Sequence, residues 1–338
     1  MQISEYVSLG HPDKIADYIS EYILDRLIEQ DPQTRYALEV QIKDNYVTLG
    51  GEVTTKASKI DYDNWVREAI MEIGYTPAYA WAWGAKEALD ASLIRVEKHI
   101  SQQSPDIAAG VNNDGWGDQG IMFGMAVNNP NTDYMPVDYY FAKKICQELY
   151  ESGIGGLDIK TQVVISDDCI SKVIVAIPLK DHISQKEKMV ENIVREIIPA
   201  DTYELIINGT GSYIRHSSMG DCGTTGRKLA VDFYGGNCNV GGGSPWTKDG
   251  TKADLALNLL ARELALKYVK ESGKKYCKCG IGCCIGRKEI DVTLWGENGG
   301  IITAYTIEVS PKALIDRYQL DKPIFAELCR NGLFSRIK

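Results

Sequence analysis

The spacing of hydrophobic residues predicts a chain that alternates between strands and helices. Residues 2–8 alternate weakly, as in a first strand. Ile15, Ile19, Tyr22, Ile23 and Leu27 then repeat at helical spacing, and Asp31-Pro32 stops the run. Residues 36–42 alternate again, turn at Lys43-Asp44-Asn45 and return over 46–54, which predicts a hairpin. A helix over 58–73 and a strand over 93–100 follow.

The same order of elements then recurs. A second unit has a strand over 121–127, a helix over 136–150, a hairpin over 161–177, a helix over 185–198 and a strand over 203–207. A third has a strand over 229–233, a helix over 251–271, strands between 276 and 309 and a helix starting at Pro311, without a readable last strand. We therefore predict an α+β fold that uses strand, helix, hairpin, helix, strand about three times. No Pro/Gly linker separates the units, so we expect one packed body.

Composition places the chain among ordinary soluble globular proteins. It has 338 residues, of which 44% are hydrophobic and 25% charged, enough for an ample core. The formal net charge of -9 argues against a nucleic-acid or anionic-membrane partner, but it allows a local basic pocket. No apolar run approaches the ~20 residues that cross a bilayer, and the N-terminus lacks the features of a signal peptide. We expect a cytoplasmic protein whose nine cysteines are reduced.

Four of these cysteines, Cys277, Cys279, Cys283 and Cys284, crowd together. A zinc site is one interpretation, but the group lacks the C-x2-C spacing of common zinc modules, and its flanks predict strands. Alternate residues of an extended strand lie ~6–7 Å apart, too far for a compact tetrahedral site without a turn. We therefore favour small buried residues.

Candidate chemistry is densest between Gly220 and Asp254. This stretch holds Arg227, Lys228, Lys248 and Lys252, next to Asp221 and Asp254, with glycine-rich turns on both sides of the predicted strand. Glycine lets backbone amides approach a ligand, and Lys or Arg neutralises its negative charge, so the stretch suits a polyphosphate. A surface turn with solvated charges is the alternative.

Three further motifs each have a structural alternative. Residues 114–120 contain a formal G-x-G-x-x-G, but an extended run follows where a dinucleotide site needs a helix, and the Walker A spacing is also missing. Residues 11–14 place an imidazole, a carboxylate and an ammonium at a helix start, which suits phosphate with Mg2+, although a helix cap is the simpler explanation. Glu39 and Glu52 belong to the first hairpin, and we expect Glu39 to be exposed because it falls opposite the apolar face.

Six motifs follow one another along the chain. They are residues 10–17 (GHPDKIAD), 50–55 (GGEVTT), 103–107 (QSPDI), 117–124 (GDQGIMFG), 219–228 (MGDCGTTGRK) and 241–254 (GGGSPWTKDGTKAD). Together they resemble the S-adenosylmethionine synthetase (methionine adenosyltransferase) family, from near the N-terminus to about residue 255, with weaker similarity beyond. One such motif can arise by chance, but six in order are specific.

The resemblance implies that the protein joins ATP and L-methionine. In this family the methionine sulfur attacks C5′ of the ribose, triphosphate leaves, and the enzyme cleaves it to phosphate and pyrophosphate. A thioether is a neutral nucleophile and needs no general base. The requirement is alignment of the sulfur, C5′ and the leaving oxygen, with cations fixed around the triphosphate.

The resemblance also implies roles for individual residues. The expected catalytic residues surround the triphosphate and are His11, Lys160, Arg227, Lys228 and Lys248. ATP binding further involves Asp158, Ser212, Tyr213, Asp221 and Ser244, and methionine binding involves Glu52, Gln103, Asp221 and Lys252. Asp118 is implied to contact the adenosine and methionine groups. Two Mg2+ ions are implied at Asp13 and Asp254, and one K+ at Glu39, which would overturn the exposed-face expectation for that residue.

For the whole molecule, the resemblance implies three similar β-α-β-β-α-β subdomains about a pseudo-threefold axis, at residues 1–101, 113–214 and 217–338. Two subunits are implied to pair through their sheets as a homodimer with active sites at the interface, and dimers can pair further into a tetramer. Residues 103–117 would form a mobile loop over the site, in keeping with their Gly, Asn and Ser content.

Several residues depart from the family pattern. The loop between 103 and 117 is short, and the C-terminal third is truncated. Ser212 stands where an arginine usually precedes the aromatic residue, and residues 215–218 (RHSS) replace Ile-Gly-Gly-Pro, both near the adenosine. The alternatives are therefore a triphosphatase that keeps only the second half-reaction, or an idle paralogue that binds AdoMet or ATP and regulates a partner.

Overall fold

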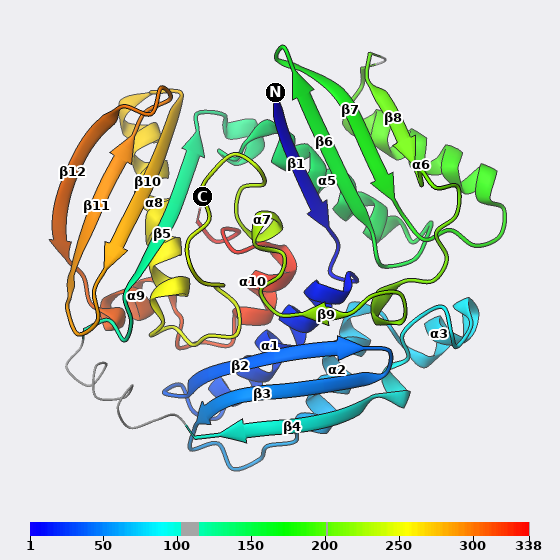
Figure 1. Ribbon diagram of the computed structural model, residues 1–338, viewed down its shortest axis with the longest axis horizontal. Helices are drawn as coiled ribbons and strands as arrows, with labels where there is room; N and C mark the ends of the chain where they lie inside the picture. Colours follow the sequence, from blue (N-terminus) through cyan, green and yellow to red (C-terminus); the bar gives the residue numbers. More distant parts are fainter. Residues whose placement is uncertain (103–114, 201, 338) are drawn as a thin grey trace.

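The computed structural model describes residues 1–102, 115–200 and 202–337. Its strands form three four-stranded sheets, which surround a central region that contains helix α10 (Phe325–Asn331) (Figure 1). The predicted α+β architecture with three related units is confirmed.

The first sheet has the strand order β4-β3-β2-β9. Its strands are β2 (Arg35–Lys43), β3 (Tyr46–Thr54), β4 (Arg95–Ser101) and the short β9 (Gly223–Thr224). β2 and β3 form the predicted hairpin, and β4 runs parallel to β3 after helices α2 (Tyr62–Ile73) and α3 (Pro77–Trp83) and the single turn η1 (Ala91–Leu93). Helix α2 starts later than predicted because the Asp61 side chain caps it by accepting a hydrogen bond from the Asn64 N–H.

The second sheet has the order β1-β6-β7-β8. Its strands are β1 (Gln2–Val7), β6 (Lys160–Ser166), β7 (Cys169–Ala176) and β8 (Glu204–Ile207). The predicted β6–β7 turn falls at Asp167 and Asp168, which adopt the left-handed conformation that aspartate tolerates. Helix α5 (Val137–Ser152), which follows the turn η2 (Pro130–Thr132), packs against β1 and β6, and α6 (Ile183–Ile197) packs against α5.

The third sheet has the order β12-β11-β10-β5. Its strands are β5 (Gly120–Val127), β10 (Tyr276–Cys283), β11 (Glu289–Trp295) and β12 (Ile301–Glu308). Helix α8 (Ala253–Ser272) packs closely on β5 and β10, because Gly124 has no side chain there: a Cβ would lie 2.1 Å from the carbonyl carbon of Ala261. Helices α9 (Pro311–Tyr318) and α10 follow β12.

Each unit of the chain places its opening strand in the sheet of another unit (Figure 1). β1 pairs with β6 of the second unit, β5 pairs with β10 of the third, and β9 pairs with β2 of the first. All three pairings are antiparallel. The exchange is therefore cyclic, and every sheet contains strands from two units.

One predicted feature of the third unit is wrong. Residues 229–233, expected as a strand, contain the one-turn helix α7 (Leu229–Asp232), which a run of five residues could not distinguish from a strand. Strands β10, β11 and β12 are the strands expected between 276 and 309, and within the described residues no strand follows α9, in keeping with the unreadable last strand. β12 returns antiparallel to β11 through a hairpin, whereas the edge strands β4 and β8 run parallel to their neighbours after a helix.

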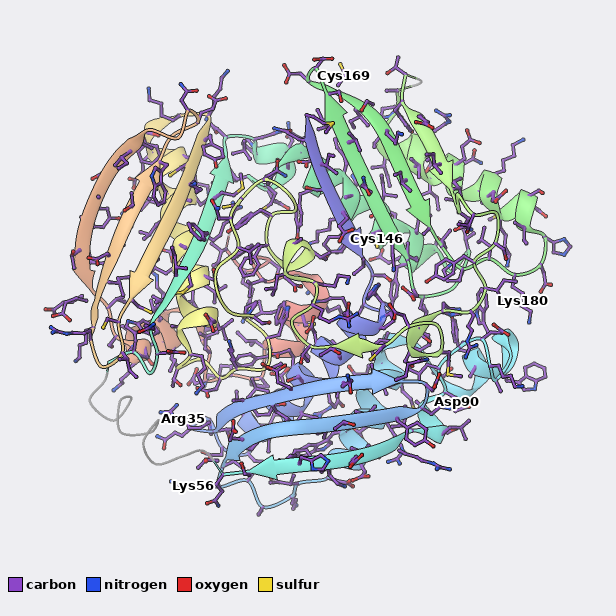
Figure 2. The ribbon with its side chains drawn as sticks, viewed as in Figure 1. Arg35, Lys56, Asp90, Cys146, Cys169 and Lys180 are labelled. Carbon is purple, nitrogen blue, oxygen red and sulfur yellow. The ribbon has the colours of Figure 1, made fainter. Side chains whose placement is uncertain are left out.

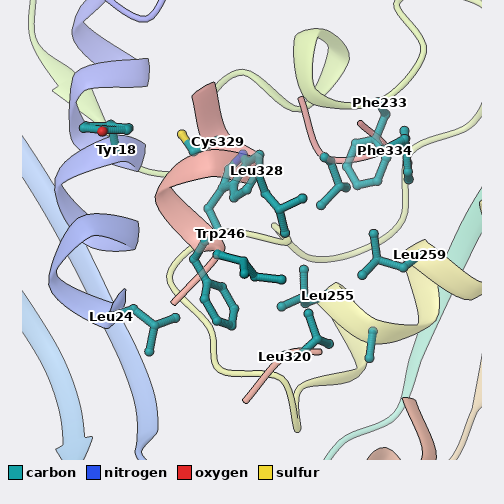
Figure 3. Close-up of a cluster of buried hydrophobic side chains, with 14 of the residues drawn as sticks. Tyr18, Leu24, Phe233, Trp246, Leu255, Leu259, Leu320, Leu328, Cys329 and Phe334 are labelled. Atoms are coloured by element: carbon teal, nitrogen blue, oxygen red, sulfur yellow. The ribbon is translucent and has the colours of Figure 1, made fainter. Parts of the chain in front are cut away.

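The largest hydrophobic cluster lies where the three units meet. Tyr18 and Leu24 of α1 (Pro12–Ile28) face it from one side, Leu255 and Leu259 of α8 from another, and Trp246 lies between them (Figure 3). Phe233 and Phe334 belong to the same cluster, near α10. Every residue of α1 except Arg26 is buried, so α1 is the central helix of the molecule rather than a surface helix.

Helix α1 carries four buried carboxylates, each four residues after the last: Asp13, Asp17, Glu21 and Asp25. Each accepts a backbone N–H from a segment of the third unit. The donors are Thr224 for Asp13, Gly226 for Asp17, Thr247 for Glu21, and Phe325 with Ala326 for Asp25. The stripe therefore fixes distant loops of the third unit along one face of α1.

The other sequence predictions have mixed outcomes. Strand β5 follows the G-x-G-x-x-G, so that motif lacks the helix of a dinucleotide site, as expected. Cys277 and Cys279 are buried, as favoured, but Cys283 is only half-buried and Cys284 is exposed beyond the end of β10. Among the described residues no cluster of three or more His, Cys, Asp or Glu could hold a metal ion, and no helix there is long and apolar enough to cross a membrane.

Candidate active site

The N-terminus of α1 presents a neutral imidazole to the site. The Nδ1 atom of His11 accepts the N–H of Asp13 at 3.1 Å, so the ring proton must lie on Nε2. Burial, together with the nearby Lys160 and Lys228, lowers the pKa of His11 to about 2. His11 is therefore an uncharged donor at neutral pH, next to a group of cations.

Those cations are partly neutralised by Asp13. Lys228 Nζ lies 2.6 Å from its Oδ2, and Arg227 Nε lies 3.0 Å from its Oδ1. The Arg227 side chain is about half exposed, whereas Asp13 is fully buried. A phosphate oxygen arriving here can compete for the same lysine and arginine donors without a large rearrangement.

A cavity of about 420 Å³ opens beside His11. It is lined by several of the predicted residues, namely His11, Asp158, Lys160, Ser212, Tyr213 and Asp221. Asp158 accepts the Ser217 N–H at 3.0 Å, and burial raises the pKa of its carboxyl to about 6, against the lowering effects of Tyr213 and Lys160. Lys160 is exposed at the first position of β6 and so is free to meet an anion.

A second group gathers at the start of α8. The Lys248 ammonium is paired with the Asp254 carboxylate, and Lys252 is the N-cap residue of the helix. Gly243 makes this approach possible, because a Cβ there would lie 2.0 Å from Asp254 Oδ2. Ser244 accepts the Trp246 N–H at 3.1 Å, which fixes the glycine-rich loop.

Asp118 lies at the edge of this second group. It is exposed, and its Oδ1 accepts the Gln119 N–H at 2.8 Å. The Cys283 thiol donates to the Asp118 carbonyl at 3.6 Å, and a Cβ on Gly120 would lie 4.0 Å from Asp254. Asp118 and Asp254 therefore both lie near Cys283.

Glu39 and Glu52 lie on the same exposed face of the first sheet. Glu52 is directly opposite Ala37, two residues from Glu39 on β2, and both glutamates are exposed, as expected for Glu39. Glu39 also accepts hydrogen bonds from two threonines, Thr225 and, at 3.1 Å, Thr247. Gln103, the remaining predicted contact, lies outside the described residues.

Comparison with known proteins identifies the family. Three family profiles match: the S-adenosylmethionine synthetase N-terminal domain over residues 1–105, its central domain over 113–213 and its C-terminal domain over 216–338. The chain belongs to the S-adenosylmethionine synthetase family. A solved structure described as an unusual S-adenosylmethionine synthetase from Campylobacter jejuni matches with a TM-score of 0.89 at 31% sequence identity, covering 99% of this chain and 94% of that chain.

Membership in the S-adenosylmethionine synthetase family settles the class of reaction. The protein is a methionine adenosyltransferase that forms S-adenosylmethionine from ATP and methionine, a reaction of one-carbon metabolism. The resemblance inferred from the six motifs is thus confirmed, and neither the triphosphatase nor the idle paralogue is favoured.

Several contacts that shape this synthetase site were not predicted. Lys14 pairs with Asp232 at 2.5 Å and Asp17 at 3.1 Å under the Trp246 ring, which fixes α7 behind the site. Burial alone would lower the pKa of Lys14, but the two carboxylates outweigh it and raise the pKa. The sequence did carry one signal, because acidic residues at every fourth position of an apolar helix are costly to bury without partners.

Proposed function

We propose that this synthetase acts by direct attack of the methionine sulfur on C5′ of ATP, releases intact triphosphate, and then hydrolyses it to phosphate and pyrophosphate. The observation that carries the proposal is the concentration of donors at the start of α1: Lys160, Arg227 and Lys228 all lie near enough to His11 to lower its pKa, and Arg227 and Lys228 pair with Asp13. Donors fixed before the reaction stabilise the charge that develops on the leaving triphosphate.

Each of these donors has a distinct role in the proposal. His11 donates a hydrogen bond from Nε2 to the oxygen that leaves C5′: its low pKa keeps the ring neutral, and the ring's single proton lies on Nε2 because Nδ1 accepts the Asp13 N–H. Lys160, Arg227 and Lys228 contact the phosphate oxygens, and Lys248 approaches from the second group. When the nucleotide binds, Arg227 and Lys228 replace their ion pairs with Asp13 by contacts with phosphate oxygens.

The carboxylates next to these cations fit the metal ions that the family implies. Mg2+ commonly takes one or two protein carboxylates and completes its shell with substrate phosphates, so the separate Asp13 and Asp254 suit two ions better than a closed cluster would. When bound, the ions would neutralise phosphate charge. Glu39, with the hydroxyls of Thr225 and Thr247, offers oxygen atoms that suit K+.

The remaining residues are assigned to the two substrates. Asp158, Ser212, Tyr213, Asp221 and Ser244 contact the nucleotide in this proposal, and Tyr213 lines the cavity with an aromatic ring suited to adenine. Methionine is held by Glu52, Gln103, Asp221 and Lys252. Asp118 contacts both the adenosine and the methionine groups.

We further propose a cytoplasmic homodimer in which the active site lies between subunits, with a tetramer as the larger alternative. Support comes from Glu39 and Glu52, which lie on the exposed face of the first sheet. A second subunit lying against this face would cover both glutamates and bring them to a substrate.

Product analysis tests the reaction. Purified protein is incubated with ATP, methionine, Mg2+ and K+, and S-adenosylmethionine is expected together with both phosphate and pyrophosphate. Release of intact triphosphate as the final product would contradict the hydrolytic step. Cleavage of added triphosphate without S-adenosylmethionine would support the triphosphatase instead, and omission of K+ or Mg2+ tests each ion separately.

A further inference from the structure

Arg215 is a cation in the nucleotide cavity without a role so far. It is exposed and lines the same cavity as His11 and Lys160. Its Nε donates to the Met219 carbonyl at 2.8 Å, which fixes the base of the guanidinium. Within the described part of the chain, neither Nη atom has a hydrogen-bond or ion-pair partner. Two donors of a held guanidinium are therefore available to a ligand.

The next residue, His216, is buried and fully hydrogen-bonded. Its Nδ1 lies 2.7 Å from the Ile214 carbonyl, and its Nε2 lies 2.7 Å from the Tyr79 hydroxyl. A carbonyl can only accept, so Nδ1 carries the proton and the neutral ring accepts the Tyr79 proton at Nε2. The Tyr79 oxygen in turn accepts the Leu157 N–H at 3.0 Å. The Leu157 N–H, the Tyr79 hydroxyl and the His216 ring thus form a relay of hydrogen bonds in which every donor has an acceptor.

The relay connects α3 to two segments that line the cavity. Tyr79 belongs to α3, Leu157 immediately precedes Asp158, and His216 follows Arg215. The ring of His216 also lies 4.7 Å from that of Trp83, and a Cβ on Gly156 would lie 3.1 Å from Nε2, so the imidazole has no room to turn. Lys180, marked beside α3 in Figure 2, donates to the Ala82 carbonyl at 2.9 Å and holds the helix from outside.

Backbone geometry places the side chains of Arg215 and His216 on opposite sides of their segment. His216 is extended, with φ −141° and ψ −178°, and its N–H donates to the Glu87 carbonyl at 2.9 Å. Successive side chains of extended backbone point in opposite directions. The His216 ring therefore packs against Tyr79 and Trp83 of α3 while Arg215 points away from them, and both residues line the cavity.

We propose that Arg215 is a nucleotide-binding residue, aimed at the phosphates by the relay of His216 and Tyr79. The guanidinium shares the cavity with Lys160 and His11, and its two free donors match the oxygens of a phosphate. Ser212, in the same cavity, offers only a hydroxyl. This inference rests on the proposed function, since it assigns one more contact to the same triphosphate.

Two binding measurements test Arg215 independently of turnover. Replacing Arg215 by Ala is expected to weaken binding of inorganic triphosphate, measured by calorimetry, by about tenfold or more, because a charge-assisted contact is lost. The KM for ATP should rise in parallel, whereas the KM for methionine and the Kd of S-adenosylmethionine, which has no phosphate, stay within about twofold. Arg215→Lys should recover part of the loss. Arg195→Ala, on the surface of α6, is the matched control.

The relay is tested through the same readout. Tyr79→Phe and His216→Gln should raise the Kd for triphosphate, and either change combined with Arg215→Ala should add little to the loss caused by Arg215→Ala alone. Far-UV circular dichroism checks that each variant folds.

An Arg215→Ala variant that binds triphosphate as tightly as the wild type would overturn the proposal. Relay variants that lower only the melting temperature, or whose effects add fully to that of Arg215→Ala, would reduce His216 to a packing residue and overturn the positioning role. A wild-type protein that binds triphosphate through Arg215 but forms no S-adenosylmethionine would leave this inference standing and refute the proposed reaction.

Discussion

His11 and His216 are held uncharged by the structure, and this makes folding sensitive to acid. Burial lowers the pKa of His11 to about 2 and that of His216 to about 4, whereas a histidine in the unfolded chain titrates near 6.5. Below about pH 6.5 the unfolded chain therefore binds protons that the folded chain does not bind, and the free energy of unfolding decreases as the pH decreases. Where a histidine is protonated in the unfolded chain and neutral in the folded one, it lowers the free energy of unfolding by about 1.4 kcal/mol for each unit by which the pH falls.

The prediction for His216 is a difference between two proteins. Urea unfolding of the wild type and of His216→Phe is measured between pH 7.5 and 4.5. The free energy of unfolding should decline less steeply in the variant, because it lacks one of the two histidines. Buried carboxyls with raised pKa, such as Asp25, act in the opposite direction but are common to both proteins and cancel in the comparison. Parallel profiles would contradict the prediction.

Lys160 should matter for rate and not for folding. It is exposed at the end of β6 and lines the cavity beside His11. Lys160→Met keeps much of the side-chain length but removes the charge, and it should raise the barrier by roughly 2–4 kcal/mol. The measurement is kcat for S-adenosylmethionine formation, with the melting temperature as a control. Lys172→Met, on the neighbouring strand β7, removes a partly exposed lysine that pairs with Glu204 and should leave the rate unchanged.

At the residue scale, the sequence predicted the charged groups better than their surroundings. His11, Lys160, Tyr213 and Asp221 were expected at the nucleotide and do line one cavity. Arg215 and His216 were noticed only as departures from the family pattern, because their effect depends on α3 packing behind them. Contacts between segments so far apart in sequence leave no local pattern.

At the scale of elements, the carboxylate stripe of α1 makes a testable claim about Asp25. Its two oxygens accept the N–H groups of Phe325 and Ala326, each at 2.9 Å, and so cap α10 from another element. Asp25→Ala should cost about 1–2 kcal/mol of unfolding free energy, the usual range for a lost N-terminal cap. Glu327→Ala, an exposed acid in the first turn of the same helix, is the control. Equal losses in the two variants would refute a specific role for Asp25.

Strand β12 is an exposed edge strand of the third sheet. It returns by a hairpin instead of a helical crossover, and Ile301 is 68% exposed at its start. Ile301→Lys is expected to change the unfolding free energy by less than about 0.5 kcal/mol, because little apolar contact is lost. Ile290→Lys, at a buried position of β11, should destabilise the fold severely. Chemical denaturation of both variants checks the contrast.

Helices and strands were predicted correctly wherever the spacing of hydrophobic residues was sustained over several helical turns or over a whole hairpin. The β2–β3 hairpin and helices α1, α5 and α8 fall close to their predicted ranges. Residues 229–233 were mistaken for a strand because their helix is only one turn long and is held by tertiary contacts, including the buried Asp232–Lys14 pair.

At the scale of the whole molecule, the cyclic exchange of strands predicts that the units cannot fold alone. The first unit without β9 loses the third-unit segments that bind the carboxylates of α1. A fragment of residues 1–101 is therefore expected to lack the near-UV circular dichroism and protease resistance of the full chain. A cooperative unfolding transition in this fragment would contradict that expectation. The boundaries 1–101, 113–214 and 217–338 stay a prediction about sequence units.

The same exchange constrains the order in which the protein can assemble during synthesis. The second sheet needs residues up to Ile207, the first needs Thr224, and the third needs Glu308. No sheet can therefore be completed before more than half of the 338-residue chain has left the ribosome. Strand β1 is made first and must wait for β6, which emerges more than 150 residues later. During this interval its unpaired edge is exposed, and nascent-chain chaperones are expected to bind there.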